Sequence, residues 1–179
     1  VSVQYANNEI GTVQPIRDIG LIIKNIRNAR RQSGNDTPLY FHADACQASP
    51  YLDLHVARLG VDLLTLNGGK MYGPKQSGML YVAGGTVLEP LVRGGGQERN
   101  VRSGTENVPA IIGFSKALEL VQADRKNEVE RLIKLRDSCI AQLKTTVPGV
   151  EITGSRKFRL PNNVHVTLQG RDNERLLVQ

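Results

Sequence analysis

An apolar run that breaks at two glycines constrains the fold of this chain more than any other feature. Residues 62–66 read as a buried strand, and Asn67, Gly68, Gly69 and Lys70 follow it directly. Glycines end a strand because their backbone can turn where other residues cannot. The pattern therefore predicts a strand that delivers one lysine amine to the end of a sheet.

Two further apolar runs, residues 1–6 and 39–43, precede this strand, and residues 15–32 and 52–59 between the runs carry helical spacing. Strands that alternate with helices are typical of an α/β protein with a mainly parallel sheet and flanking helices. A fourth strand-like run, residues 78–82, follows after a short connection, so we expect it to be antiparallel to its predecessor.

The second half of the chain has a different pattern. The predicted elements are two helices, two strands that alternate like a second sheet, and the start of a helix, at residues 107–121, 127–143, 150–152, 163–168 and 174–179. We place a domain boundary near residues 123–127. Residues 1–124 are interpreted as the C-terminal part of a large domain, and residues 125–179 as a connecting helix and the start of a smaller α+β domain. Both ends look cut, so we interpret the chain as an internal piece of a longer protein.

Polar side chains follow the predicted parallel strands. Right-handed crossovers place the loops after such strands at one edge of the sheet, where open α/β sheets bind ligands. Asn8, Asp44 and Lys70 lie in these loops, and Gln47 follows three residues after Asp44. A carboxylate and an amine on neighbouring strands suit pyridoxal phosphate, which needs a lysine for its aldehyde and an acid to keep its ring nitrogen protonated. Taken singly, Asp44 could cap a helix and Lys70 could be a solvated surface residue.

Composition excludes several classes of protein. The chain has 179 residues, a hydrophobic share of 40% and no long apolar run, so we expect no membrane helix or signal peptide and a cytoplasmic location. Its net charge is +6, but aromatic residues make up 4% and tryptophan is absent, so direct nucleic-acid binding is a weak hypothesis. Arg27, Arg30 and Arg31 are interpreted as complementing a helix dipole. Two cysteines and no metal-ligand spacing predict no disulfide framework and no metal.

Four blocks of the sequence, in order, resemble the signatures of the NifS-like cysteine desulfurases, which are class V aminotransferases of the fold type I pyridoxal-phosphate superfamily. The blocks are VSVQYANNEIGTVQPI (1–16), FHADACQ (41–47), GKMYGPK (69–75) and GGGQERNVRSGTEN (94–107). The resemblance covers the whole chain. It implies the large domain of a pyridoxal-phosphate-dependent transferase, followed by the start of the small domain.

The resemblance also implies roles for individual residues. Lys70 matches the lysine that binds the cofactor covalently and moves the substrate Cα proton. Asp44 matches the acid on the ring nitrogen, and Gln47 and Asn8 match side chains that contact the 3-hydroxyl oxygen. The implied phosphate site consists of Asn67, Gly68, Gly69 and, from the neighbouring subunit of a homodimer, Thr105. Most relatives have a histidine where this chain has Gly69, so phosphate contacts must lean on backbone amides or other segments.

The implied reaction takes sulfur from L-cysteine, giving alanine and an enzyme persulfide that passes to a sulfur-acceptor protein for iron–sulfur cluster assembly or tRNA thiolation. The nucleophilic cysteine of the family lies downstream of this chain, so the chain alone is expected to be inactive. Cys46 and Cys139 are interpreted as packing residues, and His42, His55 and His165 as packing or surface residues. The alternatives are a selenocysteine lyase, a class V aminotransferase or, from another class, a non-catalytic sulfur-transfer scaffold.

Overall fold

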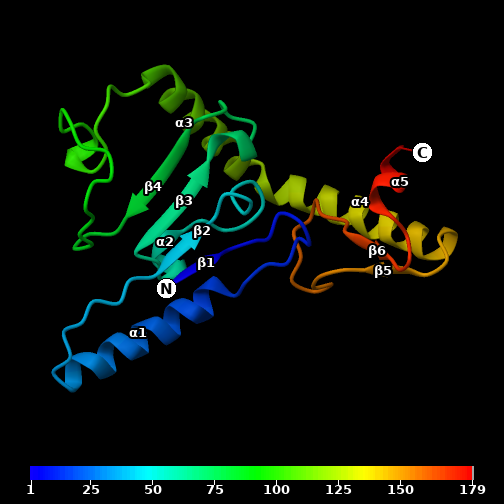
Figure 1. Cartoon of the computed structure of the whole chain (residues 1–179), viewed down its shortest axis with the longest axis horizontal. Helices are drawn as coiled ribbons and strands as arrows, with labels where there is room; N and C mark the ends of the chain where they lie inside the picture. The colour runs from blue at the N-terminus through cyan, green and yellow to red at the C-terminus, as the bar shows by residue number, and fades with distance from the viewer. Residues whose placement is uncertain (179) are drawn as a thin grey trace.

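The first half of the chain forms a four-stranded sheet with the order β1-β2-β3-β4 (Figure 1). The computed structural model describes residues 1–178. The strands are β1 (Ser2–Gln4), β2 (His42–Asp44), β3 (Leu63–Asn67) and β4 (Gly78–Val82). The first three are parallel and β4 pairs antiparallel with β3. The expected mainly parallel sheet and its antiparallel last strand are therefore confirmed.

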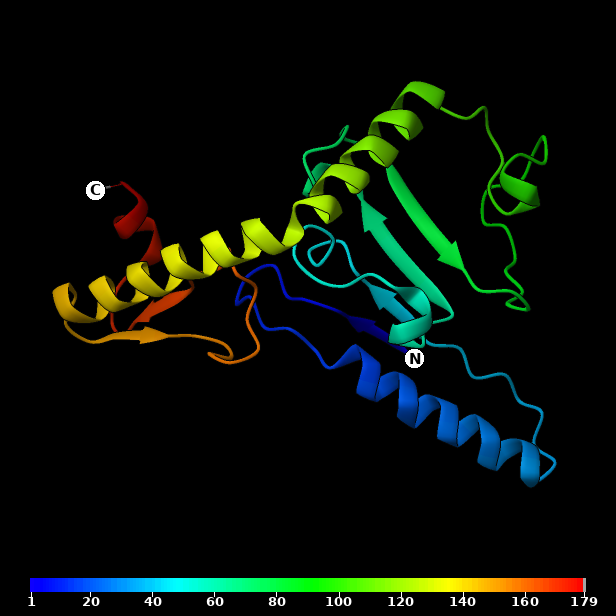
Figure 2. The same cartoon turned by 180° about the vertical axis from the view of Figure 1, so that it is seen from behind.

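Helices flank this sheet and then lead away from it. They are α1 (Ile16–Gln32), α2 (Val56–Leu59), α3 (Val108–Ala123) and α4 (Arg125–Thr146), with 3₁₀ turns η1 (Gly68–Lys70) and η2 (Glu98–Asn100). Beyond α4, β5 (Val150–Ile152) pairs antiparallel with β6 (Val166–Leu168), and α5 (Asn173–Val178) follows. In Figure 2, α4 extends away from the sheet and β5, β6 and α5 lie along it. Gln179, the last residue of the predicted final helix, lies outside the described residues.

Alternation along β2 and β3 separates an apolar face of the sheet from a polar one. The buried set, each at most 4% exposed, is Phe41, Ala43, Leu64 and Leu66. His42, Asp44 and Thr65 alternate with this set and therefore lie on the opposite face. Helix α3 adds Phe114 to the core. The side chains that follow the strands are thus held by a packed apolar layer.

Helix α1 is joined to the sheet by a polar contact that the sequence did not reveal. Arg27 Nε donates to the Leu39 carbonyl at 2.7 Å, and its guanidinium pairs with Asp62, whose Oδ2 also accepts from the Phe41 amide at 2.6 Å. Arg27 therefore links α1 to the starts of β2 and β3, whereas Arg30 and Arg31 do lie in the last turn of the helix, as the dipole interpretation expects.

Four predicted elements are shorter than their patterns suggested. The strand expected over residues 1–6 covers only Ser2–Gln4, and Ala6 beyond it pairs with Val13 instead of the sheet. Residues 39–41 lie outside β2, because Arg27 and Asp62 take up the backbone groups of Leu39 and Phe41. The helix expected over residues 52–59 is reduced to α2, since Asp53 Oδ1 accepts from the His55 amide at 3.2 Å and forms a turn in place of the first helical residues. The strand expected over residues 163–168 begins at Val166.

Ile22 and Ile26, which belong to the predicted apolar stripe of α1, are 58% and 41% exposed. The buried residues of α1 are Ile16, Gly20 and Ile23, because α1 meets α2 along a narrow line at Gly20. A Cβ on Gly20 would stand 2.5 Å from the Leu59 carbonyl oxygen, so the two backbones touch there.

The C-terminal region folds back onto the turn that follows β1. The Val13 amide donates to the Phe158 carbonyl at 2.8 Å, and the Leu160 amide donates to the Gly11 carbonyl at 2.8 Å. Leu160 is 2% exposed and belongs to the same apolar core as the sheet. We refer to residues 9–13 and 153–163 together as the seam. It brings segments about 150 residues apart in the sequence into direct contact.

Candidate functional site at the edge of the parallel strands

Asp44 ends β2 and lies between two neighbours in the sheet register. It is opposite Gln4 of β1 on one side and Thr65 of β3 on the other. Its Oδ1 accepts from the Cys46 amide at 3.0 Å, which holds the carboxylate at the start of the following turn. Asp44 thus caps a turn and not a helix, which was the alternative role considered for it. Its other carboxylate oxygen remains able to accept from a ligand.

Cys46 is half-buried beside this carboxylate. Burial, followed by the hydrogen bond and the negative charge of Asp44, raises the pKa of its thiol to about 11, against smaller opposing hydrogen bonds from Thr65 and the backbone. A thiol with that pKa stays protonated at neutral pH and is a poor nucleophile. Cys139 is exposed on α4. The surroundings of Cys46 therefore do not activate a thiolate. Cys46 is less buried than the expected core residue, and Cys139 is exposed where a packing residue was expected.

A line of polar side chains crosses the same face of the sheet, and sequence reasoning missed it. His42 Nδ1 lies 2.7 Å from Ser2 Oγ, and His42 Nε2 lies 3.3 Å from Thr65 Oγ1. Thr65, which lies opposite Asp44 in the sheet register, therefore also contacts His42 diagonally across the two strands. The signal was available: His42 and Asp44 are two residues apart in a strand, so they share a face.

The turn after β3 carries Lys70 and is shaped by close packing. A Cβ on Gly68 would stand 2.1 Å from Ser77 Oγ, so only glycine fits there. The Gly68 amide donates to the Ser77 carbonyl at 2.9 Å, and the Gly69 amide donates to Asn67 Oδ1 at 2.8 Å. Both amides that the sequence reasoning assigned to a phosphate thus have partners inside the chain. Lys70 is exposed at the end of η1.

The turn after β1 distinguishes the two adjacent asparagines. Asn7 Oδ1 accepts from the amides of Glu9 and Ile10, each at 2.9 Å, and Asn7 Nδ2 donates to Gln4 Oε1 at 3.2 Å. Asn7 is therefore occupied in closing the turn. Asn8 is exposed at the turn, which agrees with its selection as the residue that contacts a ligand. Gln47 is half-buried after β2.

Thr105 lies in the long connection from β4 to α3, and both views show this connection standing away from the sheet (Figures 1 and 2). The connection is tied to itself: the Ser103 amide donates to the Val92 carbonyl at 3.1 Å, and the Gly104 amide donates to Gln97 Oε1 at 2.9 Å. Thr105 is exposed. The structure thus brings Asn8, Asp44, Gln47 and the Asn67–Lys70 turn to one edge and leaves Thr105 in a separate loop.

Two cavities of the described residues lie away from the sheet edge. Cavities of about 250 and 540 Å³ are lined by the end of α1 and by the second half of α4, and the residues of the sheet edge line neither. Within residues 1–178, no cluster of three or more His, Cys, Asp or Glu side chains is arranged to hold a metal ion. Across the same residues, every helix is too short or too polar to cross a membrane.

Comparison with known protein families gives one match that spans the described chain. The sequence model of the aminotransferase class-V family matches residues 1–178. Two curated relatives are named cysteine desulfurase IscS. The chain is 43% identical to the one from Methanosarcina thermophila and 41% identical to the one from Dictyoglomus turgidum, with 99% of the chain aligned in each case. The chain spans 41% and 42% of the length of these two relatives.

Solved structures show the same relation. A NifS-like protein from Rickettsia africae matches with a TM-score of 0.87 and 32% sequence identity, over 99% of this chain and 46% of that one. The mixed sheet with its flanking helices is thus the arrangement found in NifS-like proteins.

Proposed function

Because the chain belongs to the aminotransferase class-V family, we propose that the complete protein is a pyridoxal-phosphate-dependent cysteine desulfurase. Similarity to two proteins named cysteine desulfurase IscS supports this choice within the family. The chain spans less than half of their length, so the activity is proposed for the longer protein. The substrate is L-cysteine, and the products are alanine and a persulfide on a cysteine outside this chain.

The observation that carries the proposal is the placement of Asp44 and Lys70 after two adjacent parallel strands, β2 and β3. The donor set there fits pyridoxal phosphate, which supplies an electron sink for a substrate carbanion when it is bound. Asp44 would hold a proton on the ring nitrogen, and Lys70 would bind the aldehyde and then carry the proton taken from the substrate Cα. Asn8 and Gln47 can donate to the 3-hydroxyl oxygen without adding charge.

The phosphate group needs partners other than the amides of Gly68 and Gly69, which are already engaged. The Asn67 amide nitrogen is one candidate, since its oxygen is the atom that caps η1. Thr105 is the second, reaching across from the other subunit of a homodimer. The long connection that stands off from the sheet supports this composite site, because a projecting loop can enter a neighbouring copy.

The persulfide sulfur would then pass to an acceptor protein, either an iron–sulfur scaffold or an enzyme of tRNA thiolation. The basic charge of the chain, +6, favours acidic partners. A selenocysteine lyase would use the same residues of this chain. A non-catalytic scaffold is favoured by one observation, the engaged amides of Gly68 and Gly69.

The test is product analysis with the full-length protein. Wild type supplied with pyridoxal phosphate and L-cysteine should release alanine and, with a reductant, sulfide in equal amounts. Lys70→Ala should lower this rate by roughly a thousandfold, since it removes both the attachment point and the proton carrier. Lys75→Ala, at another exposed lysine of the same turn, is the matched control and should keep the rate. With a 2-oxo acid such as 2-oxoglutarate added as amino-group acceptor, conversion of L-cysteine to 3-mercaptopyruvate without sulfide or alanine would indicate an aminotransferase. No turnover of either kind would indicate the scaffold.

A further inference from the structure

The turn that carries Asn8 is held from two sides. From within the sheet edge, Asn7 closes it through the amides of Glu9 and Ile10. From the C-terminal region, Asn163 Nδ2 donates to the Glu9 carbonyl at 2.7 Å, and His165 Nδ1 lies 3.2 Å from the same oxygen. The residue next to Asn8 is thus bound by side chains more than 150 positions away in the sequence.

Gly11, at the other end of this turn, packs directly on Asn163. A Cβ on Gly11 would stand 2.5 Å from Asn163 Cγ and Oδ1, and its φ of +69° also excludes most side chains. The Leu160 amide donates to the Gly11 carbonyl at 2.8 Å. Asn163 therefore contacts the turn at two places, the Glu9 carbonyl and Gly11. These contacts limit the positions that the backbone of Asn8 can take.

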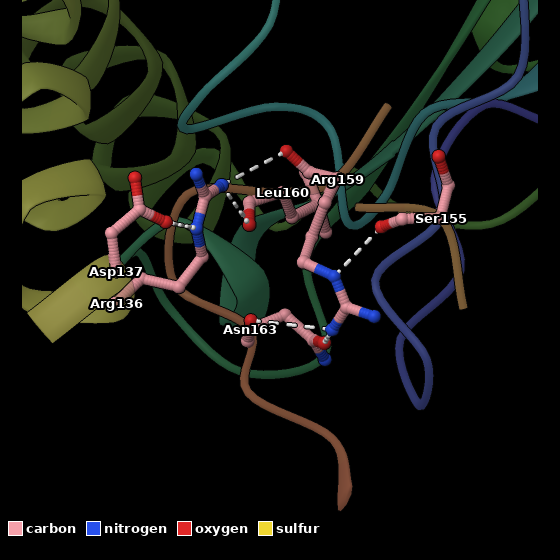
Figure 3. Close-up of polar contacts among 6 residues, drawn as sticks. All are labelled: Arg136, Asp137, Ser155, Arg159, Leu160 and Asn163. Carbon is pink, nitrogen blue, oxygen red and sulfur yellow. Dashed lines mark hydrogen bonds and ion pairs between the residues drawn. The ribbon is translucent and has the colours of Figure 1, made fainter. Parts of the chain in front are cut away.

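Asn163 is itself fixed by a buried arginine (Figure 3). Arg159, 7% exposed, donates from Nη1 to Asn163 Oδ1 at 2.6 Å and from Nε to the Ser155 carbonyl at 2.9 Å. Its other terminal nitrogen donates to the Thr153 carbonyl. From α4, Arg136 Nη1 donates to the Leu160 carbonyl at 3.3 Å, which holds the same segment from behind.

An asparagine is the residue that this position requires. Arg159 can only donate hydrogen bonds and the Glu9 carbonyl can only accept them, so the side chain between them must accept at one end and donate at the other. The amide of Asn163 does both, and its contact with Arg159 fixes which end faces Glu9. A carboxylate would keep the contact with Arg159 but would face the Glu9 carbonyl with a second acceptor.

We propose that Asn163, oriented by Arg159, is a positioning residue that sets the place of Asn8 at the sheet edge. The link between Asn8 and the cofactor rests on the proposed function. The claim that Asn163 holds the turn rests only on the contacts of the seam. The position of the C-terminal region then determines the position of Asn8. It acts through the hydrogen bond to the Glu9 carbonyl and makes no contact with the reacting groups.

Hydrogen exchange and cofactor titration of the full-length protein together test whether Asn163 positions Asn8. In cofactor-free Asn163→Asp, the amides of Glu9 and Ile10 should exchange about tenfold faster than in wild type, because loss of one hydrogen bond and gain of a repulsive contact loosen the turn. The Kd for pyridoxal phosphate should rise about tenfold, and the visible absorbance band of the bound cofactor should shift in the same direction as in Asn8→Ala.

Ser155→Ala is the matched control, because it removes the hydroxyl oxygen that accepts from the Phe158 amide at 2.9 Å, without touching Asn163 or Glu9. It should leave the exchange at Glu9, the Kd and the absorbance band unchanged. Should Asn163→Asp fail to fold, His165→Ala removes the second contact to Glu9 and should change each quantity in the same direction by about threefold.

Unchanged exchange at Glu9 and Ile10 in Asn163→Asp would overturn the proposal, as would faster exchange with an unchanged Kd and absorbance band. If wild type binds no pyridoxal phosphate at all, the proposed function fails, and the exchange result alone then decides whether Asn163 holds the turn.

Discussion

The sheet edge around Lys70 and the seam around Arg159 place a cation in opposite situations. Lys70 is exposed at the end of η1, and among the described residues it donates no hydrogen bond. Arg159 is 7% exposed and donates to the side-chain amide of Asn163 and to the backbone carbonyls of Thr153 and Ser155. The comparison shows how one chain separates a cation available for chemistry from a cation that holds backbone segments together.

Burial without an acid partner has an electrostatic cost at the seam. Burial lowers the pKa of Arg159, and the positive charge of Arg136 lowers it further. The guanidinium stays charged because arginine is effectively always protonated in proteins. Carbonyl dipoles, not a carboxylate, therefore compensate this charge. The sheet edge does contain a carboxylate, because Asp44 ends the strand next to the one that delivers Lys70.

After the loss expected for Lys70→Ala, the largest expected effect concerns Asp44, the acid of the sheet edge. Asp44→Asn keeps an oxygen for the Cys46 amide but removes the negative charge, so the activity of the full-length protein should fall by roughly a hundredfold or more while the fold is retained. Steady-state sulfide release measures the activity and circular dichroism checks the fold. Asp53→Asn, which alters a carboxylate paired with exposed Arg58, should keep the activity. Equal activity in Asp44→Asn and wild type would remove Asp44 from the site.

At the seam, Arg159→Met should lower the free energy of unfolding by about 3 kcal/mol, because buried carbonyls of residues 153 and 155 lose their donors. Urea unfolding of the full-length protein measures it. Arg58→Met removes a cation of a surface ion pair and should cost much less. If the two variants lose equal stability, Arg159 is not the structural cation described here.

The two cysteines sharpen the contrast between the regions. With a pKa of about 11 against an ordinary value of 9.0, Cys46 should carry roughly a hundredfold less thiolate at pH 8 than an unperturbed thiol, so iodoacetamide should modify exposed Cys139 first. Peptide mass spectrometry resolves the two sites. The folded chain holds the Cys46 proton more tightly than the unfolded chain does, so this contribution to stability is present below pH 9 and is lost as the pH rises toward 11. Faster modification of Cys46 than of Cys139 would contradict the environment described here.

The smallest expected effect is a loss of stability at Gly68. It distinguishes a glycine required by close packing from one that only adds backbone freedom. Gly68→Ala should destabilise by about 2 kcal/mol, because the added Cβ meets Ser77 Oγ and the Pro74 carbonyl oxygen. Gly84→Ala meets open space at an ordinary φ and should be neutral or slightly stabilising. Thermal unfolding of both variants decides whether Gly68 is fixed by contact, and equal melting temperatures would show that it is not.

Local patterns predicted the sheet because its strands follow simple rules. The run before Lys70 became β3 and η1, and Gly78–Val82 became an antiparallel strand with the expected bounds. Errors arose where a side chain captured backbone groups. Asp62 and Arg27 displaced the start of β2, and Asp53 shortened α2. Such contacts join residues far apart or compete locally with a helix, and periodicity carries no information about either.

The candidate site was predictable in part for the same reason. Residues after parallel strands must meet at one edge, so Asp44 and Lys70 could be paired from the sequence. The seam could not be found this way, because Asn163 and Arg159 contact residues 9–13 only after the whole chain has folded. The division into residues 1–124 and 125–179 stays a prediction. The same holds for the roles of all the predicted site residues, which are Asn8, Asp44, Gln47, Asn67, Gly68, Gly69, Lys70 and Thr105.

Reduction with borohydride tests the central claim most directly. Full-length protein saturated with pyridoxal phosphate is reduced and digested, and the peptide containing Lys70 is sequenced by mass spectrometry. A phosphopyridoxyl group on Lys70, absent from Lys70→Ala and unaffected in Lys75→Ala, is the predicted result. An unmodified Lys70 at saturating cofactor would contradict the account and would mean that the exposed amine of this sheet edge serves no cofactor.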